Sequence, residues 1–394
     1  MQPAHGALLI GVLVAALAAP PAFSEQSALQ GSSDLLADAP SLGPFSIQIQ
    51  ADADVLLALG DGEAREDAPY ADISVRIEAE AINQDGLRYG ARLSPRIQRD
   101  NGRRGLARAV AGAPTQPGLL SGLSRGEFDP ASVRGGVETA ELFIKTGWGE
   151  AVLGVGDGAA RLEAAELPGA FRLMRADGAL ADSTGLMLVD TAHGLSGRAA
   201  KLTVRSRRLI GFRASASFTP QADLCGVDAC AAGSGLAERV AELALSFDRR
   251  LRSTGARWAA SVAMSAGEAS PRFDPATDAL DDPVVLSVRL VRERNGVSAG
   301  LGWLRSNDGL AEGRYEALSA ALAYERGDWL YAFEAARGEA EPSGLDGWSI
   351  QLGASRLLAG GALIGIGVVH AEEAARGASS RSTTQLFLET GLRF

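Results

Sequence analysis

Charged or small side chains occupy nearly every second position in two neighbouring segments, residues 71–82 and 86–97. The charged face of this pair carries Arg76, Glu78, Glu80, Arg88, Arg92 and Arg96. A period of two is typical of β-strands, whose successive side chains point to opposite faces. Such charges can pair across strands or solvate a polar surface, and for any single residue both interpretations stay open.

The turn between the two segments determines which charges meet. Both charged faces lie on the same side only if the turn after Ile82 holds an odd number of residues. With three residues, Arg76 would lie opposite Arg92, and like charges in direct register are destabilising. With five residues, Glu78 would face Arg92 and form an ion pair with it.

Candidate catalytic side chains are scarce. The chain has 3 histidines, and only His193 and His370 lie beyond its first residues. A barrel hydrolase would need one of them beside a nucleophile and an orienting group, which the sequence does not identify. His370 shares its parity with Ile364, Ile366 and Val368, which indicates an apolar boundary. An enzyme is therefore the less favoured alternative, and we expect no catalytic residues, metal or cofactor.

The two cysteines fit an exported protein. Cys225 and Cys230 lie in the glycine-rich stretch DLCGVDACAAG, which is typical of a loop. The spacing between them matches no common metal or redox motif. We therefore expect a Cys225–Cys230 disulfide, as forms readily outside the cytoplasm.

The N-terminus carries a short apolar run, GALLIGVLVAALAA, over residues 6–19. The run is too short to span a bilayer. Ala22 and Ser24, which follow it, have the spacing of a signal-peptidase site. We expect residues 1–24 to be a signal peptide and residues 25–43 to be a periplasmic N-terminal segment.

Alternation continues through the rest of the chain to its last residues, STTQLFLETGLRF, where Leu386 and Leu388 oppose Gln385 and Glu389. This pattern predicts an all-β fold of about sixteen strands. The predicted strands cover residues 45–59, 71–82, 86–97, 137–146, 149–156, 198–206, 210–219, 236–248, 254–266, 283–293, 296–306, 313–325, 328–339, 347–357, 361–371 and 382–394.

Tight turns alternate with long polar connections between these strands. The turns are NQDG, TGWG, SRRL, RRLRS, ERNG, ERGD and LLAGG. An even number of strands with this rhythm, behind a signal peptide, predicts a transmembrane antiparallel β-barrel with both termini in the periplasm. Residues 44–394 would form the barrel. A soluble secreted β-protein remains an alternative, because alternation alone does not distinguish the two.

Two connections are long, at residues 98–136 and 157–197. The second predicts a short helix from Arg161 to Leu167 that ends before Pro168. It also carries the apolar residues Phe171, Leu173, Met174, Leu186 and Leu188. A loop in solvent would not need them, so we expect this connection to fold back into the barrel.

Three segments resemble the Gram-negative general porins. AELFIKTGWGEAVLGVGDG resembles the segment that leads into their constriction loop. AAKLTVRSRRLIGFRASASFTP is similar to the hairpin after that loop, especially in alphaproteobacterial members. The terminal Phe394 resembles the family's C-terminal signature, which the outer-membrane assembly machinery reads. The resemblance implies a sixteen-stranded barrel, an inward-folded third external loop and a homotrimer in a membrane of lipid and lipopolysaccharide.

In that family, acidic loop residues face basic wall residues across a narrowed aqueous channel. By position, the resemblance implies loop acids at Asp157, Glu163 and Glu166. The implied wall bases are Arg76, Arg88, Arg92, Arg96, Lys145, Lys201 and Arg205. Such an arrangement would set up a transverse field that favours polar solutes.

The sequence therefore predicts a porin of the cell outer membrane that passes small hydrophilic solutes and ions passively. A substrate-specific channel is the main alternative, and a plugged structural barrel is another. The net charge of −10 and the lack of a basic tract argue against nucleic-acid binding. The same acidic balance predicts a weak preference for cations.

Overall fold

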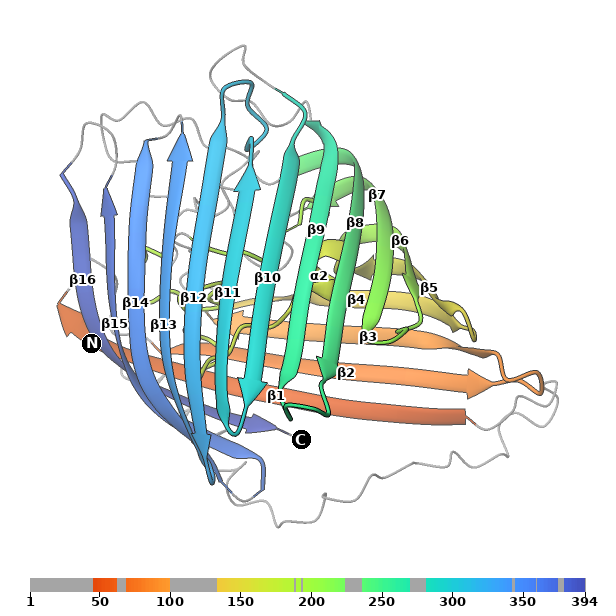
Figure 1. Ribbon diagram of the computed structural model, residues 1–394, viewed down its shortest axis with the longest axis horizontal. Coiled ribbons are helices and arrows are strands. Elements are labelled where there is room, and N and C mark those ends of the chain that lie inside the picture. Colours follow the sequence, from red (N-terminus) through yellow and green to blue (C-terminus); the bar gives the residue numbers. More distant parts are fainter. Residues whose placement is uncertain are drawn as a thin grey trace.

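Sixteen antiparallel strands close into one barrel in the computed structural model (Figure 1). The structure describes residues 45–61, 69–99, 133–187, 189–192, 194–223, 236–269, 281–341, 344–358, 360–374 and 379–393. The strands are β1 (Phe45–Asp61), β2 (Tyr70–Ile82), β3 (Arg88–Arg99), β4 (Val133–Lys145), β5 (Gly149–Gly156), β6 (Ala199–Ser206), β7 (Phe212–Asp223), β8 (Leu236–Arg250), β9 (Arg257–Ala269), β10 (Val284–Arg294), β11 (Val297–Ser306), β12 (Arg314–Arg326), β13 (Trp329–Glu341), β14 (Leu345–Leu357), β15 (Ala362–Ala374) and β16 (Arg381–Arg393). One short helix, α2 (Ala159–Glu163), follows β5.

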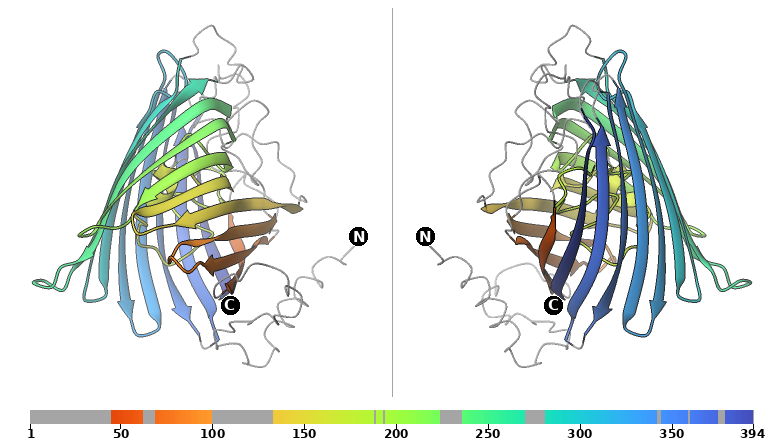
Figure 2. Two further views of the ribbon diagram at one scale, coloured as in Figure 1. Left: turned by 90° about the vertical axis from the view of Figure 1, so that its right-hand side faces the viewer. Right: turned by 90° about the vertical axis from the view of Figure 1, so that its left-hand side faces the viewer.

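Each strand pairs with its neighbours in the sequence, and β1 closes the barrel against β16. All sixteen predicted segments overlap a strand, and their ends differ from the observed ones by 4 residues or fewer. In Figure 1, β1–β3 run across the direction of β10–β13. Opposite walls of a barrel with tilted strands cross in this way. The side views in Figure 2 follow the wall round to β16.

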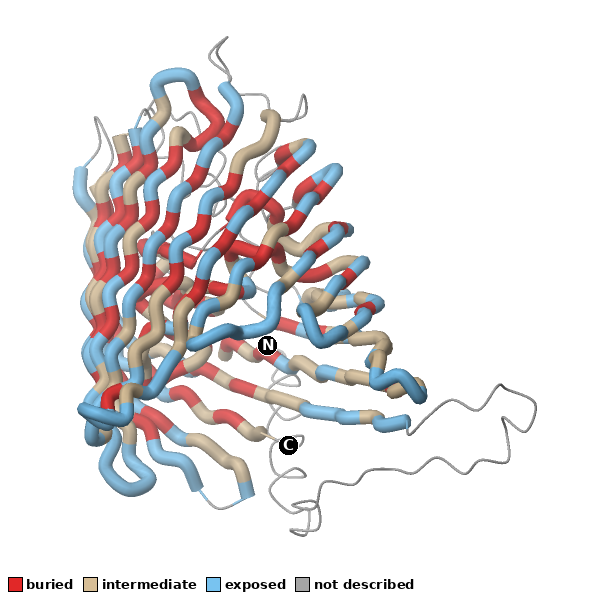
Figure 3. Tube along the Cα trace, turned by 45° about the vertical axis from the view of Figure 1, so that its right-hand side comes forward, coloured by how far each residue is buried: buried red, intermediate tan, exposed pale blue. Residues whose placement is uncertain are grey.

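The faces of the strands follow the predicted alternation. On β16, Leu386 and Leu388 are exposed on the outside, whereas Gln385, Phe387 and Glu389 are buried inside. Figure 3 shows the same alternation of exposed and buried residues along the strands. The outer surface is therefore apolar and the interior polar, which is the distribution of a barrel in lipid. Among the described residues, no helix has the length and apolar character needed to cross a membrane.

The first described hairpin turn has five residues, Asn83 to Leu87, because Ile82 pairs with Arg88. The Asn83 side chain organises the turn by accepting hydrogen bonds from the backbone N–H groups of Asp85 (3.0 Å) and Leu87 (2.8 Å). Gly86 takes a positive φ of 78°, which suits glycine. Glu78 consequently lies opposite Arg92, so the five-residue alternative is confirmed.

Candidate functional site

The connection between β5 and β6, residues 157–198, lies inside the barrel, and we call it the inner loop. It contains α2, which begins and ends earlier than the predicted helix over residues 161–167. Its apolar residues Leu167, Phe171, Leu173, Met174 and Leu186 are buried. The prediction that this connection folds inward is confirmed, and Figure 3 shows its buried residues within the wall. Leu188 and His193 lie outside the described residues.

Three wall carboxylates bind backbone N–H groups of the inner loop. Glu389 on β16 accepts hydrogen bonds from the N–H groups of Arg172 (2.7 Å), Leu173 (3.1 Å) and Met174 (3.3 Å). Glu242 on β8 accepts from Ala160 at 3.1 Å and Ser196 at 3.0 Å. Glu334 on β13 accepts from Ala176 at 3.2 Å. Charged acceptors make stronger hydrogen bonds than neutral ones, so these contacts fix the loop backbone.

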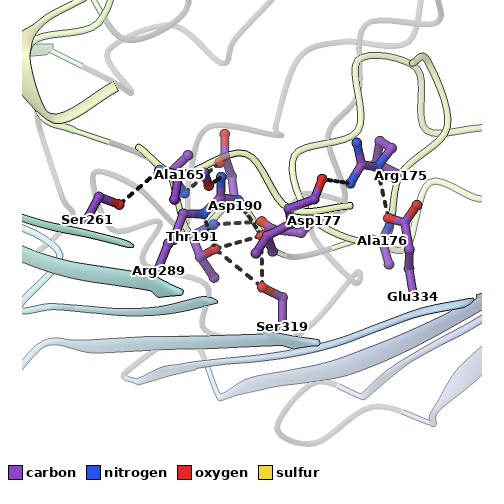
Figure 4. A network of polar contacts seen from close by, with 12 residues as sticks. Ala165, Arg175, Ala176, Asp177, Asp190, Thr191, Ser261, Arg289, Ser319 and Glu334 are labelled. Atoms are coloured by element: carbon purple, nitrogen blue, oxygen red, sulfur yellow. Dashed lines mark hydrogen bonds and ion pairs between the residues drawn. The ribbon is translucent and has the colours of Figure 1, made fainter. Parts of the chain in front are cut away.

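A buried ion pair fastens the middle of the loop to β10. Nη2 of Arg289 lies 2.5 Å from Oδ2 of Asp177. The same carboxylate accepts hydrogen bonds from the hydroxyls of Thr191 at 2.6 Å and Ser319 at 2.8 Å. Arg289 also donates to the carbonyl oxygen of Ala165 at 3.0 Å. Figure 4 shows these groups converging from the loop and from two strands.

Phe171 packs into a slot on the wall that only glycines leave open. Its ring meets Phe387 of β16 edge-on, with centroids 4.7 Å apart. A Cβ atom added at Gly353 would lie 2.4 Å from this ring, and one at Gly365 would lie 2.7 Å from it. Together with the polar contacts, the slot holds this part of the loop against the β8–β16 side of the barrel, and β2–β6 form the opposite wall.

That opposite wall carries a network of ion pairs, which we call the wall ladder: Glu78, Glu80, Arg92, Glu141, Lys145 and Glu150. Arg92 contacts Glu78 at 3.1 Å, Glu150 at 2.5 Å and Glu141 at 3.6 Å. Lys145 contacts Glu78 at 2.9 Å and Glu80 at 2.8 Å. The side chains of Arg92 and Lys145 are 19% and 29% exposed, whereas Glu389 is 0% exposed. The ladder therefore faces the water-accessible part of the lumen.

The structure pairs most of the candidate wall bases with carboxylates of the wall. Arg96 pairs with Asp72 and with Glu138 at 2.7 Å. Arg88 is 56% exposed and lies 3.4 Å from Glu80. Lys201 is buried and donates to the Ser196 hydroxyl at 3.1 Å. Arg76 is exposed and has no ion pair with any residue that the structure describes.

Arg205 is the candidate base that meets a candidate loop acid. Its Nη2 lies 2.9 Å from Oε1 of Glu163. Burial raises the pKa of the Glu163 carboxyl, but hydrogen bonds from Ser246, Ser215 and Arg205 outweigh it, and the pKa lies below its ordinary value. Glu163 is therefore a carboxylate at neutral pH.

The other two candidate acids lie elsewhere on the loop. Asp157 pairs with Arg198 at 3.3 Å, and Glu166 is exposed. The resemblance to the porins implied acids on the loop facing bases on the wall, but the candidate wall bases mostly pair with carboxylates of the wall. The part that each residue takes in a constriction stays a prediction.

Glu138 and the loop arginines Arg172 and Arg175 are among the charged residues that were not candidates. Glu138 reaches the lumen through a bulge, because Ser94 pairs with Thr139 and Pro95 pairs with Val137. Bulges re-aim side chains in this way, and Pro95, which has no N–H group, was the available signal. The loop arginines Arg172 and Arg175 bind Asp72 (3.0 Å) and Glu334 (2.9 Å) on the wall. These arginines lie between apolar residues of the loop, and nothing in the sequence around them indicated that Asp72 and Glu334 would be their partners.

A cavity of about 640 Å³ lies between the inner loop and the wall, near the end of the barrel that carries the tight turns. Its arginines come from both sides: Arg161, Arg172, Arg175, Arg257, Arg289 and Arg393. Glu166, Asp177, Asp190 and Glu293 also line it. No cluster of three or more potential metal ligands occurs in the described part of the chain.

His370 faces outward, as its parity predicted. Its Nδ1 lies 2.7 Å from the hydroxyl of Thr384, and its ring is 5.0 Å from that of Trp348. Among the described residues, no carboxylate hydrogen-bonds to this ring. Cys225, Cys230 and Phe394 lie outside the residues that the structure describes.

No family model matches the chain, and no curated protein matches it in sequence. Its structure is similar to that of OprB from Pseudomonas putida at high pH, with a TM-score of 0.59, 9% identity, and coverage of 89% of this chain and 94% of that one. An anion-selective porin from Comamonas acidovorans gives 0.56 and 11%, covering 89% and 100%. A trimer form of OmpT, an outer membrane protein of Vibrio cholerae, gives 0.54 and 12%, covering 89% and 99%. At such identities the likeness shows the fold alone, that of an outer-membrane porin barrel.

Proposed function

We propose that the chain forms a water-filled channel in the outer membrane of a Gram-negative cell, through which small hydrophilic solutes and ions diffuse passively. One observation carries this proposal: an inner loop narrows a closed barrel with an apolar exterior and leaves the charged wall ladder partly exposed inside. Charged groups along a lumen solvate passing polar solutes. The proposed channel has no cofactor and no energy coupling.

The orientation in the membrane follows from the connections. The tight turns and both termini would lie in the periplasm, after removal of residues 1–24, and the long connections would lie outside. Residues 25–43 would remain periplasmic and residues 44–394 would form the barrel. We further propose the Cys225–Cys230 disulfide, and recognition of Phe394 by the assembly machinery.

The homotrimer also belongs to this proposal. Its support is the trimer form of the structurally similar OmpT. Analytical ultracentrifugation of the refolded chain in detergent tests it, since a monomer would contradict the proposed assembly.

Single-channel recording tests the proposed function directly. The mature chain, residues 25–394, is refolded and added to a planar lipid bilayer. Stepwise openings on the order of a nanosiemens are expected of a wide aqueous pore. Silence from a barrel that still shows heat-modifiable mobility on gels would refute the open channel and favour a plugged structural barrel.

A substrate-specific channel is the second candidate, because arginines of the loop and of the wall line one cavity. Arginine is well suited to bind carboxylate and phosphate groups. Small conductance that one organic anion blocks at micromolar concentration would favour this candidate. Conductance that a panel of such anions leaves unchanged would favour general diffusion.

A further inference from the structure

Arginines collect on the outer surface of β8–β14 at the end with the tight turns, on the wall nearest the viewer in Figure 1. The exposed residues that face outward there are Arg249, Arg292, Arg294, Arg326 and Arg356. The lumenal positions of the same strand ends hold Asp248 and Glu293, which pair with Arg257 at 2.7 Å and 3.5 Å. The acids of β8 and β10 thus face inward at this end, whereas these five arginines face outward.

Four of these arginines form two matching groups across the strands, each with a tryptophan between two arginines. Trp258 on β9 pairs in register with Arg249 of β8 and Arg292 of β10. Trp329 on β13 pairs in register with Arg326 of β12 and Arg356 of β14. We call these groups the Arg–Trp–Arg triplets.

One arginine of each triplet lies over its indole ring. The guanidinium carbon of Arg292 is 5.5 Å from the ring centroid of Trp258, and that of Arg356 is 5.6 Å from the centroid of Trp329. These are distances of a cation–π interaction, which holds a guanidinium in place and leaves its N–H groups free to donate. The two triplets therefore present similarly oriented donors.

The triplets have little compensation from carboxylates. Within the part of the chain that the structure describes, Arg249, Arg292 and Arg326 form no ion pair. Arg356 reaches Asp328 at 3.7 Å. Strands two apart are about 10 Å apart, so the two arginines of a triplet can approach one anion from either side. An anion there would relieve their mutual repulsion.

The position along the strands limits what that anion can be. Leu245, Leu290 and Leu322 are exposed on the same outer face, two to four positions further from the turns. The triplets thus lie at the border of the apolar band. Tryptophan and arginine at this level of a membrane protein meet lipid headgroups.

We propose that the two Arg–Trp–Arg triplets bind the phosphate groups of anionic phospholipids in the leaflet that surrounds the tight turns. This inference rests on the proposed membrane location, in which that leaflet is the periplasmic one. The ligand class is a phospholipid with net negative charge, for which phosphatidylglycerol is the probe.

The test compares two double variants of the mature chain in phosphatidylcholine bilayers. Each bilayer contains a trace of spin-labelled phosphatidylglycerol or spin-labelled phosphatidylcholine, and electron paramagnetic resonance gives the fraction of each held at the protein surface. An arginine near a membrane surface favours anionic lipid by about fivefold. The wild-type chain should therefore prefer phosphatidylglycerol by more than fivefold, and R292Q/R356Q, which removes one arginine from each triplet, should lower the ratio about fivefold.

The matched control is R250Q/R257Q. It removes two charges from the same end of the barrel, but from positions that face inward and pair with Glu293 and Asp248. The control should keep the wild-type ratio. An equal loss of preference in both variants, or a wild-type ratio of one in well-inserted protein, would overturn the assignment. A chain that fails to insert into phosphatidylcholine at all would instead overturn the proposed membrane location.

Discussion

Replacing Arg92 by glutamine should make the channel strongly selective for cations. Arg92 lies among three carboxylates, Glu78, Glu141 and Glu150, and its loss leaves Lys145 as the only cation of the wall ladder. The four carboxylates of the ladder would then face one positive charge. The change is a full unit of charge beside the path of a permeating ion.

The size of the effect follows from Coulomb's law. A unit charge about 6 Å from an ion in water contributes about 0.7 kcal/mol, or roughly a threefold change in partition. Cation entry should rise and anion entry fall by this factor, so the permeability ratio should change about tenfold. At 0.1 M salt the screening length is about 10 Å, so roughly half of this energy survives and the permeability ratio should still change about threefold.

The assay is the reversal potential in a salt gradient across a planar bilayer. Arg92→Lys keeps the charge and should keep the wild-type value. Arg337→Gln removes an arginine that faces outward and pairs with Asp346, and it should leave the value unchanged. A shift of similar size in Arg337→Gln, or a shift towards anions in Arg92→Gln, would refute the assignment of the ladder to the ion path.

Four further outcomes are expected. Gly353→Val should displace Phe171 and destabilise the barrel by about 1–3 kcal/mol. The loss of heat-modifiable mobility should then occur at a lower temperature. Gly147→Ala should leave that temperature unchanged, because a Cβ atom at Gly147 would meet open space. Asp177→Asn should destabilise the barrel by about 3–5 kcal/mol in urea titrations, because it breaks a buried ion pair, and an unchanged midpoint would contradict the anchoring of the loop. The pKa of Glu163 is lowered in the folded chain, so its stabilisation is present above its ordinary pKa of 4.5 and is lost as the pH falls through the lowered value; Glu163→Gln should remove that part of the acid dependence of unfolding. Intact-mass analysis without reductant should find no alkylatable thiol, and two labelled cysteines would contradict the proposed disulfide.

The strands were predictable because each one must alternate between lipid and lumen. The burial of Gln385 and Glu389 beside exposed Leu386 and Leu388 follows from parity alone. The pairing of Glu78 with Arg92 was predictable only as one of two outcomes, because turn length decides it. The hydrogen bonds of Asn83 that fix this turn join residues close in sequence, so the length of the turn could in principle be predicted from the local sequence.

The contacts that hold the inner loop against the wall were not predictable from the sequence. Glu389 binds the N–H group of Arg172 across 217 residues of sequence, and nothing near either residue specifies the other. The apolar character of Phe171 predicted its burial. Its slot, however, depends on glycines of β14 and β15, and glycine has no side chain that could indicate a partner. Contacts of this kind depend on closure of the whole barrel rather than on local periodicity.

The carboxylate of Glu389 couples the order of assembly to the shape of the lumen. Glu389 belongs to β16, the strand that closes the barrel against β1, so three N–H groups of the loop have no acceptor on the wall until the last strand is in place. Contacts this distant in sequence form late, because the entropy of closing the intervening chain must first be overcome. A barrel stalled before closure would expose residues 157–198 to proteases, whereas the closed barrel would protect them, and cleavage of the inner loop would then report how far folding has gone.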